Sequence, residues 1–264
     1  MIPNNHLIFN HRFFEHAYKN NPDSKTLPIL IKLYKNNIFI VFISVFEKVF
    51  SFFLGLRIPI YSDLMLMFVT HLPGLPHMFG CYMRGLYYKN KLKVMEANVL
   101  IEQGAIISHP EQVELSEFSL IDKYVIIAAN TAKIGRRVHL APYVFISGGG
   151  DFIIEDYACM ASGAKAITST ETLKPGTRSS GPMIPPEQRD VLKGMVHIKR
   201  DAFIAVNVTI LTNTIVEEGV VLTSGIVASG ATEKWTYYVT KDSANKPVRM
   251  QRVMGRKKID LPDI

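Results

Sequence analysis

The sequence contains little cysteine and no recognisable nucleic-acid motif. Its two cysteines, Cys81 and Cys159, lie far apart and form no CxxC pair, which excludes a disulfide framework or a zinc site built on cysteine pairs. The formal net charge is +7, but zinc-finger spacing, an RNP signature and a GxxxxGK phosphate loop are all missing. We therefore expect reduced thiols and no nucleic-acid partner, and we assign the basic charge to phosphate-bearing ligands or anionic lipids.

The first 21 residues have no basic start followed by an apolar run, so we expect no cleaved signal peptide. Apolar residues make up 48% of the sequence, and they are densest before Asn98. The run over 36–62 is almost long enough to span a bilayer, but Glu47 and Lys48 lie at its centre, where each charge costs about 2.5–3.5 kcal/mol. The next run, 63–93, contains two prolines, which argue against a straight spanning helix.

Two interpretations of these runs remain open. They are either core helices that pack on the rest of the chain, or an interfacial hairpin on a membrane surface. The apolar excess favours the second, which predicts a helical, membrane-associated region over 1–97. It also predicts basic side chains at lipid headgroups and two tyrosines at the water boundary, namely Arg57, Arg84, Lys89, Lys91 and Lys93 with Tyr87 and Tyr88.

After Asn98 the pattern changes to a period of six. In "IGRRVHLAPYVFISGGG" the large aliphatic residues are Ile134, Leu140 and Ile146, and neither strand alternation nor a helical period fits them as well. The same spacing, with insertions of one or two residues, covers 101–166 and 198–228. The predicted inward positions are Ile101, Ile107, Val113, Ile121, Ile127, Ile134, Leu140, Ile146, Ile154, Met160, Ala166, Ile198, Ile204, Ile210, Val216, Leu222 and Ala228.

A period of six predicts a parallel β-helix with three short faces, in which each coil buries its apolar edge against its neighbours. We place this domain at 98–232 and an external loop at 167–197, where the hexads stop. The last segment, 233–264, is a basic tail with six Lys and Arg residues between 246 and 258.

The hexad [LIV]-[small]-x-x-[small/V]-x resembles that of the left-handed β-helix acyltransferases over about 101–228. The segments "VHLAPYVFISGGG" and "TSTETLKPGTRSSGPMIPPEQRDVLKGMVHI" are most similar to bacterial sugar O- and N-acetyltransferases of surface-polysaccharide synthesis. The resemblance implies a mainly β fold, a left-handed parallel β-helix behind an α-helical, apolar N-terminal region. It also implies a homotrimer with sites between subunits and acetyl-CoA as co-substrate. The γ-class carbonic anhydrases share the helix and resemble one another in a three-histidine zinc site, but after the first coil only His139 and His197 lie within the helix here, so we expect no metal.

The resemblance suggests three catalytic candidates. His139 precedes the aliphatic residue of the "APYV" coil and is the first candidate for a general base, although such a histidine also fits a packing role. Glu171 opens the external loop and could bind the acceptor sugar or orient a histidine. Asp201 lies where related enzymes often place a histidine or asparagine. The loop 167–196 lacks the histidine that many O-acetyltransferases of this fold carry.

The cofactor-binding candidates lie in and after the last hexads. Ala205 and Asn207 belong to "IAVN", where the family usually has "IGAG", so the groove for coenzyme A is altered. Gly225 follows in the next coil, and Lys257 in the tail is a candidate for binding phosphate.

The resulting hypothesis is an acetyl-CoA-dependent transferase that acetylates a hydroxyl or amino group of a nucleotide- or lipid-linked sugar in surface-glycan synthesis. We expect it at the cytoplasmic face of the inner membrane, peripheral or monotopic. The alternative is a non-catalytic trimeric β-helix scaffold that docks at the membrane, which the altered groove favours.

Overall fold

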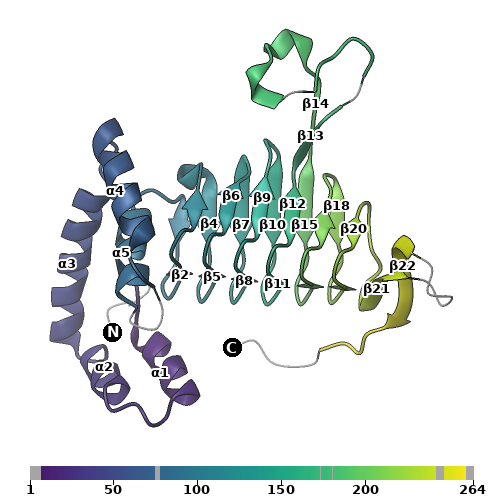
Figure 1. The fold of residues 1–264 in the computed structure, drawn as a ribbon. Coiled ribbons are helices and arrows are strands. Elements are labelled where there is room, and N and C mark those ends of the chain that lie inside the picture. The colour runs from purple at the N-terminus through teal and green to yellow at the C-terminus, as the bar shows by residue number, and fades with distance from the viewer. Residues whose placement is uncertain (1–6, 75–77, 173, 180, 242–246, 260–264) are drawn as a thin grey trace.

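The computed structural model describes residues 7–74, 78–172, 174–179, 181–241 and 247–259. In this part of the chain, five α-helices precede a parallel β-solenoid (Figure 1). The fold class predicted from the hexads is therefore confirmed. The helices are α1 (His11–Asn20), α2 (Leu27–Leu33), α3 (Asn37–Leu54), α4 (Pro59–His71) and α5 (Phe79–Lys89).

Local sequence signals set the ends of α3 and α4. The side chain of Asn36 accepts hydrogen bonds from the backbone N–H groups of Ile38 and Phe39, which caps the start of α3. Pro59 begins α4, where its missing N–H has no helical partner to lose. Between the two helices the chain turns at Gly55, so α3 and α4 are separate elements rather than one long helix.

The solenoid has three sheets, which the chain visits in turn. Sheet A contains β1 (Val94–Met95), β4 (Val113–Leu115), β7 (Thr131–Ile134), β10 (Asp151–Ile154), β15 (Met195–Ile198) and β18 (Thr214–Val216). Sheet B contains β2 (Leu100–Ile101), β5 (Leu120–Ile121), β8 (His139–Leu140), β11 (Cys159–Met160), β16 (Phe203–Ile204), β19 (Val221–Leu222), β21 (Thr236–Lys241) and β22 (Pro247–Gly255). Sheet C contains β3 (Ile106–Ile107), β6 (Ile126–Ala128), β9 (Phe145–Ser147), β12 (Lys165–Ile167), β17 (Thr209–Ile210) and β20 (Val227–Ala228).

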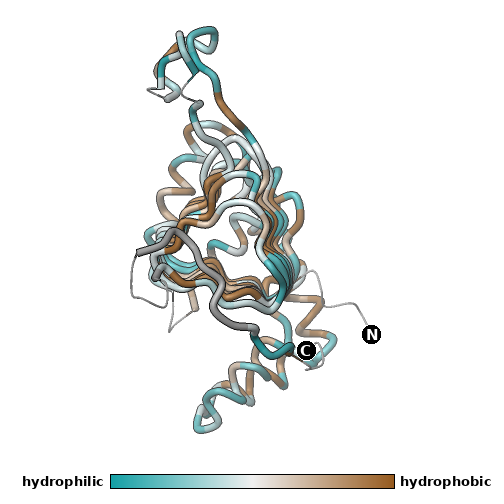
Figure 2. The backbone as a smooth tube through the Cα atoms, turned by 90° about the vertical axis from the view of Figure 1, so that its right-hand side faces the viewer, coloured by the Kyte–Doolittle hydropathy of each residue, from teal (hydrophilic) through white to brown (hydrophobic). Residues whose placement is uncertain are grey.

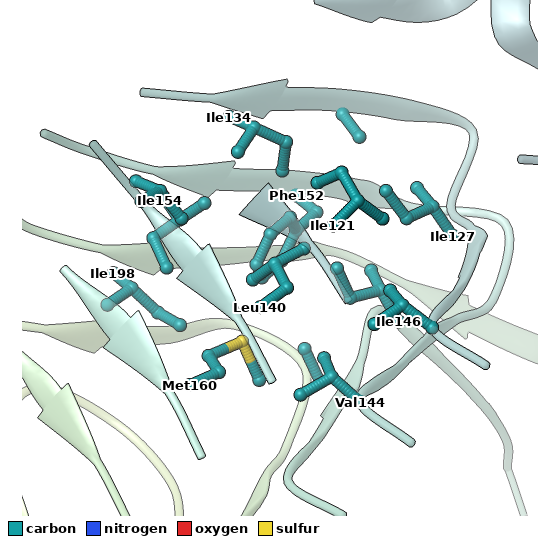
Figure 3. Close-up of a cluster of buried hydrophobic side chains, with 14 of the residues drawn as sticks. Ile121, Ile127, Ile134, Leu140, Val144, Ile146, Phe152, Ile154, Met160 and Ile198 are labelled. Carbon is teal, nitrogen blue, oxygen red and sulfur yellow. The ribbon is translucent and has the colours of Figure 1, made fainter. Parts of the chain in front are cut away.

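The core of the solenoid is the stack of inward residues that the hexads predict. None of the predicted inward side chains is more than 5% exposed. Ile154 lies opposite Ile134 of the preceding coil and Ile198 of the following one, and Figure 3 shows these side chains pointing into a shared interior. Viewed along its axis, the solenoid is a prism whose walls are stacked coils of the chain (Figure 2). Each fully buried aliphatic side chain contributes about 1.5–3 kcal/mol.

The interruption of the hexads is an external hairpin. β13 (Ser169–Glu171) and β14 (Val191–Lys193) pair antiparallel and project from the edge between sheets C and A (Figure 1). Short 3-10 segments lie at Gly181–Met183 and Pro186–Gln188 in this hairpin and at Pro110–Gln112 in the first coil. Part of the tail expected over 233–264 forms β21 and β22, which extend sheet B at the end of the solenoid.

Several residues predicted to lie at lipid headgroups are instead buried. Arg84, Tyr87, Tyr88 and Lys91 are at most 5% exposed, because α5 packs between the other helices and the first coil, so this part of the prediction is wrong. Arg57 and Lys93 are exposed. α5 is therefore a core helix, as the first interpretation expects, and it closes the apolar N-terminal end of the solenoid.

The carboxylate of Glu47 is buried on the inner side of α3. It accepts hydrogen bonds from the backbone N–H of Ile8 (2.9 Å) and the hydroxyl of Tyr82 (3.1 Å). Burial raises the pKa of Glu47 to about 7, although these hydrogen bonds and the charge of Lys89 oppose the shift. The buried Tyr34 also faces this carboxylate. Keeping the ionised Glu47 carboxylate inside the folded protein therefore lowers the stability of the fold, and the loss grows with the fraction that is ionised.

We expect stability to fall as Glu47 ionises. Its folded pKa lies above the ordinary 4.5, so its contribution is fully present below about pH 4.5 and is lost as pH rises through about 7. In Glu47→Gln the amide oxygen can accept from Ile8 and the NH2 group can donate to the Tyr82 hydroxyl, and the side chain does not titrate. Relative to this variant, the wild-type free energy of unfolding should drop by about 3 kcal/mol across this window. Urea denaturation of both proteins at pH 5 and pH 8 measures this difference, and parallel pH profiles would contradict it.

Candidate functional site

Residues with a left-handed backbone define two edges of the prism. The B–C edge is the column of turn residues between sheets B and C, namely Gly104, Tyr124, Tyr143, Gly163, Asn207 and Gly225. The A–B edge is the corresponding column between sheets A and B, namely Asn98, Phe118, Arg137, Tyr157, Asp201, Gly219 and Trp235. The candidates Asp201, Asn207 and Gly225 belong to these two columns.

His139 lies at the start of β8 and points out of the prism, while Leu140 points in. Its Nε2 lies 3.2 Å from Oδ2 of Asp122, in the preceding coil, and its side chain is 42% exposed. A carboxylate that faces one ring nitrogen fixes the orientation of the imidazole and leaves Nδ1 for a reacting group. His139 therefore has the partner that a general base needs.

Glu171 ends β13 in the external hairpin and forms an ion pair with Arg189 across its base. Its other carboxylate oxygen, Oε2, is buried and has no hydrogen-bond partner among the described residues, so it can accept one more donor. No histidine of the described part of the chain is bonded to Glu171. Its contacts indicate that it holds the hairpin closed.

Asp201 lies on the A–B edge with φ 58°. Its side chain is 3.4 Å from the guanidinium of Arg200, and its backbone carbonyl accepts a hydrogen bond from Nη1 of Arg256. Lys257 is exposed beside that arginine. Lys246 in the tail lies outside the described residues. After β22, the described residue that hydrogen-bonds to the solenoid is thus Arg256 rather than Lys257.

The cofactor candidates Ala205, Asn207 and Gly225 lie together at the B–C edge. Asn207 stacks on Gly163 of the preceding coil, so closely that a Cβ on that glycine would lie 2.4 Å from its Oδ1. A Cβ on Gly225 would meet nothing within 4 Å. Toward the helices the same edge is bulky, because Tyr124 and Tyr143 stack with ring centroids 5.3 Å apart. The later coils therefore offer a backbone that a ligand can approach closely.

The three catalytic candidates do not form one cluster. His139 lies on the outer face of sheet B, Asp201 lies two coils further along the A–B edge, and Glu171 lies on the hairpin beyond sheet C. Among the described residues, no hydrogen bond or ion pair joins any two of them.

A second histidine pair lies on sheet A. Nε2 of His197 is 2.7 Å from Oε1 of Glu155, and Oε2 of Glu155 accepts a hydrogen bond from the backbone N–H of Arg200. The carboxylate also lines a surface pocket of about 260 Å³, together with Lys133 and Asp156. Sequence reasoning missed this pair, because the external loop separates its members by 42 positions.

The chain is similar to known acyltransferases, although no protein-family model matches it. It is 26% identical over 149 residues to the dTDP-4-amino-4,6-dideoxy-D-glucose acyltransferase of Escherichia coli. The aligned residues make up 56% of this chain and 77% of that enzyme. It also resembles a variant of AntD, an N-acyltransferase from Bacillus cereus, in complex with dTDP and coenzyme A. That match has a TM-score of 0.55 and 25% identity over 61% of this chain and 82% of AntD.

A second AntD variant, in complex with dTDP-4-amino-4,6-dideoxyglucose and coenzyme A, gives the same TM-score, identity and coverage. Two findings thus agree: the hexads fill the core of a solenoid, and the sequence is similar to that of acyltransferases. The chain resembles the hexapeptide-repeat β-helix acyltransferases in both fold and sequence. It is therefore an acyltransferase, which disfavours the scaffold alternative.

In this hexapeptide-repeat acyltransferase, two features are suited to an acyl-transfer reaction. The half-exposed His139–Asp122 pair can accept and release a proton. The small residues of the later coils at the B–C edge leave backbone near Gly225 accessible to a long, thin ligand. Within the described residues, no group of three or more His, Cys, Asp or Glu side chains is arranged to hold a metal ion.

Proposed function

We propose that the protein transfers an acetyl group from acetyl-CoA to the amino group of a nucleotide-linked aminosugar. The observation that carries the proposal is the similarity of its solenoid to an N-acyltransferase in complex with both dTDP and coenzyme A. The external hairpin without a histidine supports amine rather than hydroxyl acceptors, since an amine that is already neutral needs no base before it attacks.

The reaction requires one proton transfer, for which His139 is placed. The amine nitrogen attacks the thioester carbonyl carbon, and the C–N bond forms as the C=O π electrons move to the oxygen. The C–S bond breaks when this tetrahedral intermediate collapses. The nitrogen loses a proton and the thiolate of coenzyme A gains one. With Nε2 held by Asp122, Nδ1 of His139 accepts the first proton and delivers it to the sulfur. A backbone N–H stabilises the oxyanion of the tetrahedral intermediate.

The proposed donor site is the B–C edge at Ala205, Asn207 and Gly225. The small residues Ala205 and Gly225 let the pantetheine arm lie against the backbone, and the open space around Gly225 supports this placement. Lys257 remains the candidate for a phosphate of coenzyme A, because it is exposed near the end of sheet B.

We further propose a homotrimer that works in surface-glycan synthesis at the cytoplasmic face of the inner membrane. Separation of His139 from Glu171 and Asp201 within one chain supports sites completed by a neighbouring subunit. α3 supports the location, because it is the one described helix that is long and apolar enough to cross a membrane by length and composition.

The assay that tests this function measures release of coenzyme A from acetyl-CoA with dTDP-4-amino-4,6-dideoxyglucose as acceptor. We expect transfer at least about 100-fold faster than to the 4-hydroxy analogue, because only the amine attacks readily without prior deprotonation. A lipid-linked aminosugar serves as the second acceptor. No transfer to any acceptor, together with no binding of acetyl-CoA in calorimetric titration, would overturn the proposal.

A further inference from the structure

The outermost helix, α3, exposes its apolar side and buries its polar one. Along the buried side lie Ile40, Glu47 and Ser51. Ile40 packs with Leu7 and Tyr34, and Glu47 contacts Tyr82 of α5. The opposite side carries large apolar residues that are 44–83% exposed, namely Ile38, Val41, Phe42, Val45, Val49, Phe50, Phe52 and Phe53. A surface helix of a water-soluble protein has the reverse arrangement.

α4 extends this apolar surface. Its exposed stripe consists of Ile60, Leu64, Met67 and Phe68, each 48–77% exposed, while Val69 on its other side packs into the core. The hydroxyl of Tyr61 in α4 donates a hydrogen bond to the carbonyl of Phe53, 2.7 Å away, which ties the two helices together. Both helices lie at the end of the molecule farthest from β21 and β22 (Figure 1). We call the exposed residues of α3 and α4 the outer face.

The charges around the outer face favour a lipid surface over a protein partner. Between residues 22 and 72 the exposed basic side chains are Lys25, Lys32, Lys35, Lys48 and Arg57, against the exposed acids Asp23 and Asp63. Lys35 is paired with Glu15, and the remaining excess of charge is still basic. Lysine is depleted in protein interfaces, whereas a basic rim is attracted to anionic headgroups. The surface also contains a hollow of about 230 Å³ lined only by Phe42, Val45, Phe46, Val49 and Phe50, which suits an acyl chain.

The contacts of Glu47 prevent α3 from crossing the bilayer. The helix has 18 residues and a mean hydropathy of 1.9, so composition alone would allow a crossing. However, Glu47 is 2% exposed, and its carboxylate is held by Ile8 and Tyr82 of the folded body. A spanning helix would have to give up both hydrogen bonds and place this carboxyl in hydrocarbon.

We propose that the outer face is a monotopic docking surface that enters the headgroup–acyl boundary of an anionic bilayer, with α3 lying parallel to the membrane plane. α3 runs across the solenoid axis (Figure 1), so the solenoid projects from the membrane into water. The B–C edge and the external hairpin then stay open to water-soluble donors and acceptors. The inference deepens the proposed membrane location and does not depend on which acceptor is acylated.

Vesicle flotation tests the docking surface with the full chain. We expect the protein to float with vesicles of phosphatidylglycerol and phosphatidylethanolamine and to bind vesicles of phosphatidylcholine alone less. The double variant Phe42→Asp and Val49→Asp should lose binding by at least about 10-fold and keep its circular dichroism spectrum, because both side chains point outward. Met183→Asp, at a residue 88% exposed on the external hairpin, is the matched control and should bind as the wild type.

Two results would overturn the proposal. The wild-type protein could stay in the aqueous fraction with both kinds of vesicle. Alternatively, sedimentation without lipid could show a larger assembly that the double variant breaks apart, which would assign the outer face to a protein partner. Neither result bears on acetyl transfer, which is assayed separately with soluble acceptors.

The orientation of α3 has its own test. Ile38→Cys and Phe53→Cys, each in a Cys159→Ser background, place a fluorophore at either end of α3, about 22 Å apart along the helix. Quenching by lipids that carry a quencher at known depths should give the same shallow depth at both sites. Clearly different depths at the two sites would show that α3 crosses the membrane and would overturn the in-plane orientation.

Discussion

Replacing Arg84 by methionine should destabilise the protein by about 3–5 kcal/mol, because it leaves a buried carboxylate without its cation. Arg84 is fully buried in α5. Its guanidinium donates hydrogen bonds to the carbonyls of Ile101, Val69 and Leu72 at 2.6–2.8 Å, and it lies 3.9 Å from the carboxylate of Glu102, which is 1% exposed. One side chain thus joins α4, α5 and the first coil of the solenoid.

Chemical denaturation of Arg84→Met measures the loss, and Arg57→Met is the control. Arg57 is exposed and makes one long hydrogen bond of 3.4 Å, so its replacement should change stability by no more than about 0.5 kcal/mol. Adding Glu102→Met to Arg84→Met should recover part of the loss, since both buried charges are then gone. A destabilisation below about 1 kcal/mol in the single variant would contradict this account.

The solenoid could be predicted from the sequence because its core depends on a short repeat. Ile134, Leu140 and Ile146 are all fully buried, as a period of six requires. The pairing of coils follows from the same repeat, so an inward position in one coil lies beside an inward position in the next. The pattern can be recognised within a few neighbouring residues, and it continues after the insertions of one or two residues at the edges of the prism.

The contacts between charged residues could not be predicted in the same way. Sequence position placed Arg84 at a lipid surface, but its partners come from α4 and the first coil, and no repeat relates those segments. Asp122 precedes His139 by 17 positions, close to one coil, so the repeat could have indicated this pair. Charge and hydropathy alone do not identify which face of α3 is buried, because its buried face is the more polar one.

Substituting His139 by asparagine should lower the rate of acetyl transfer by about 100-fold without unfolding the protein, as expected when a general base is removed. His139 is 42% exposed and its contact with Asp122 lies on the outer face of sheet B, so the core below it, at Leu140, stays packed. The fall should appear in kcat, while KM for acetyl-CoA stays within a few-fold, since the donor is bound along the B–C edge.

The matched control for His139→Asn is His197→Asn, because His197 forms a similar pair with Glu155 on another sheet. If His139 is the base, the His197 variant should keep its rate, and Asp122→Asn should lower kcat less than His139→Asn does, since it removes only the group that orients the ring. The opposite pattern, with loss at His197 and none at His139, would move the base to the Glu155 pocket. A His139 variant that loses thermal stability but keeps its rate per folded molecule would make His139 structural.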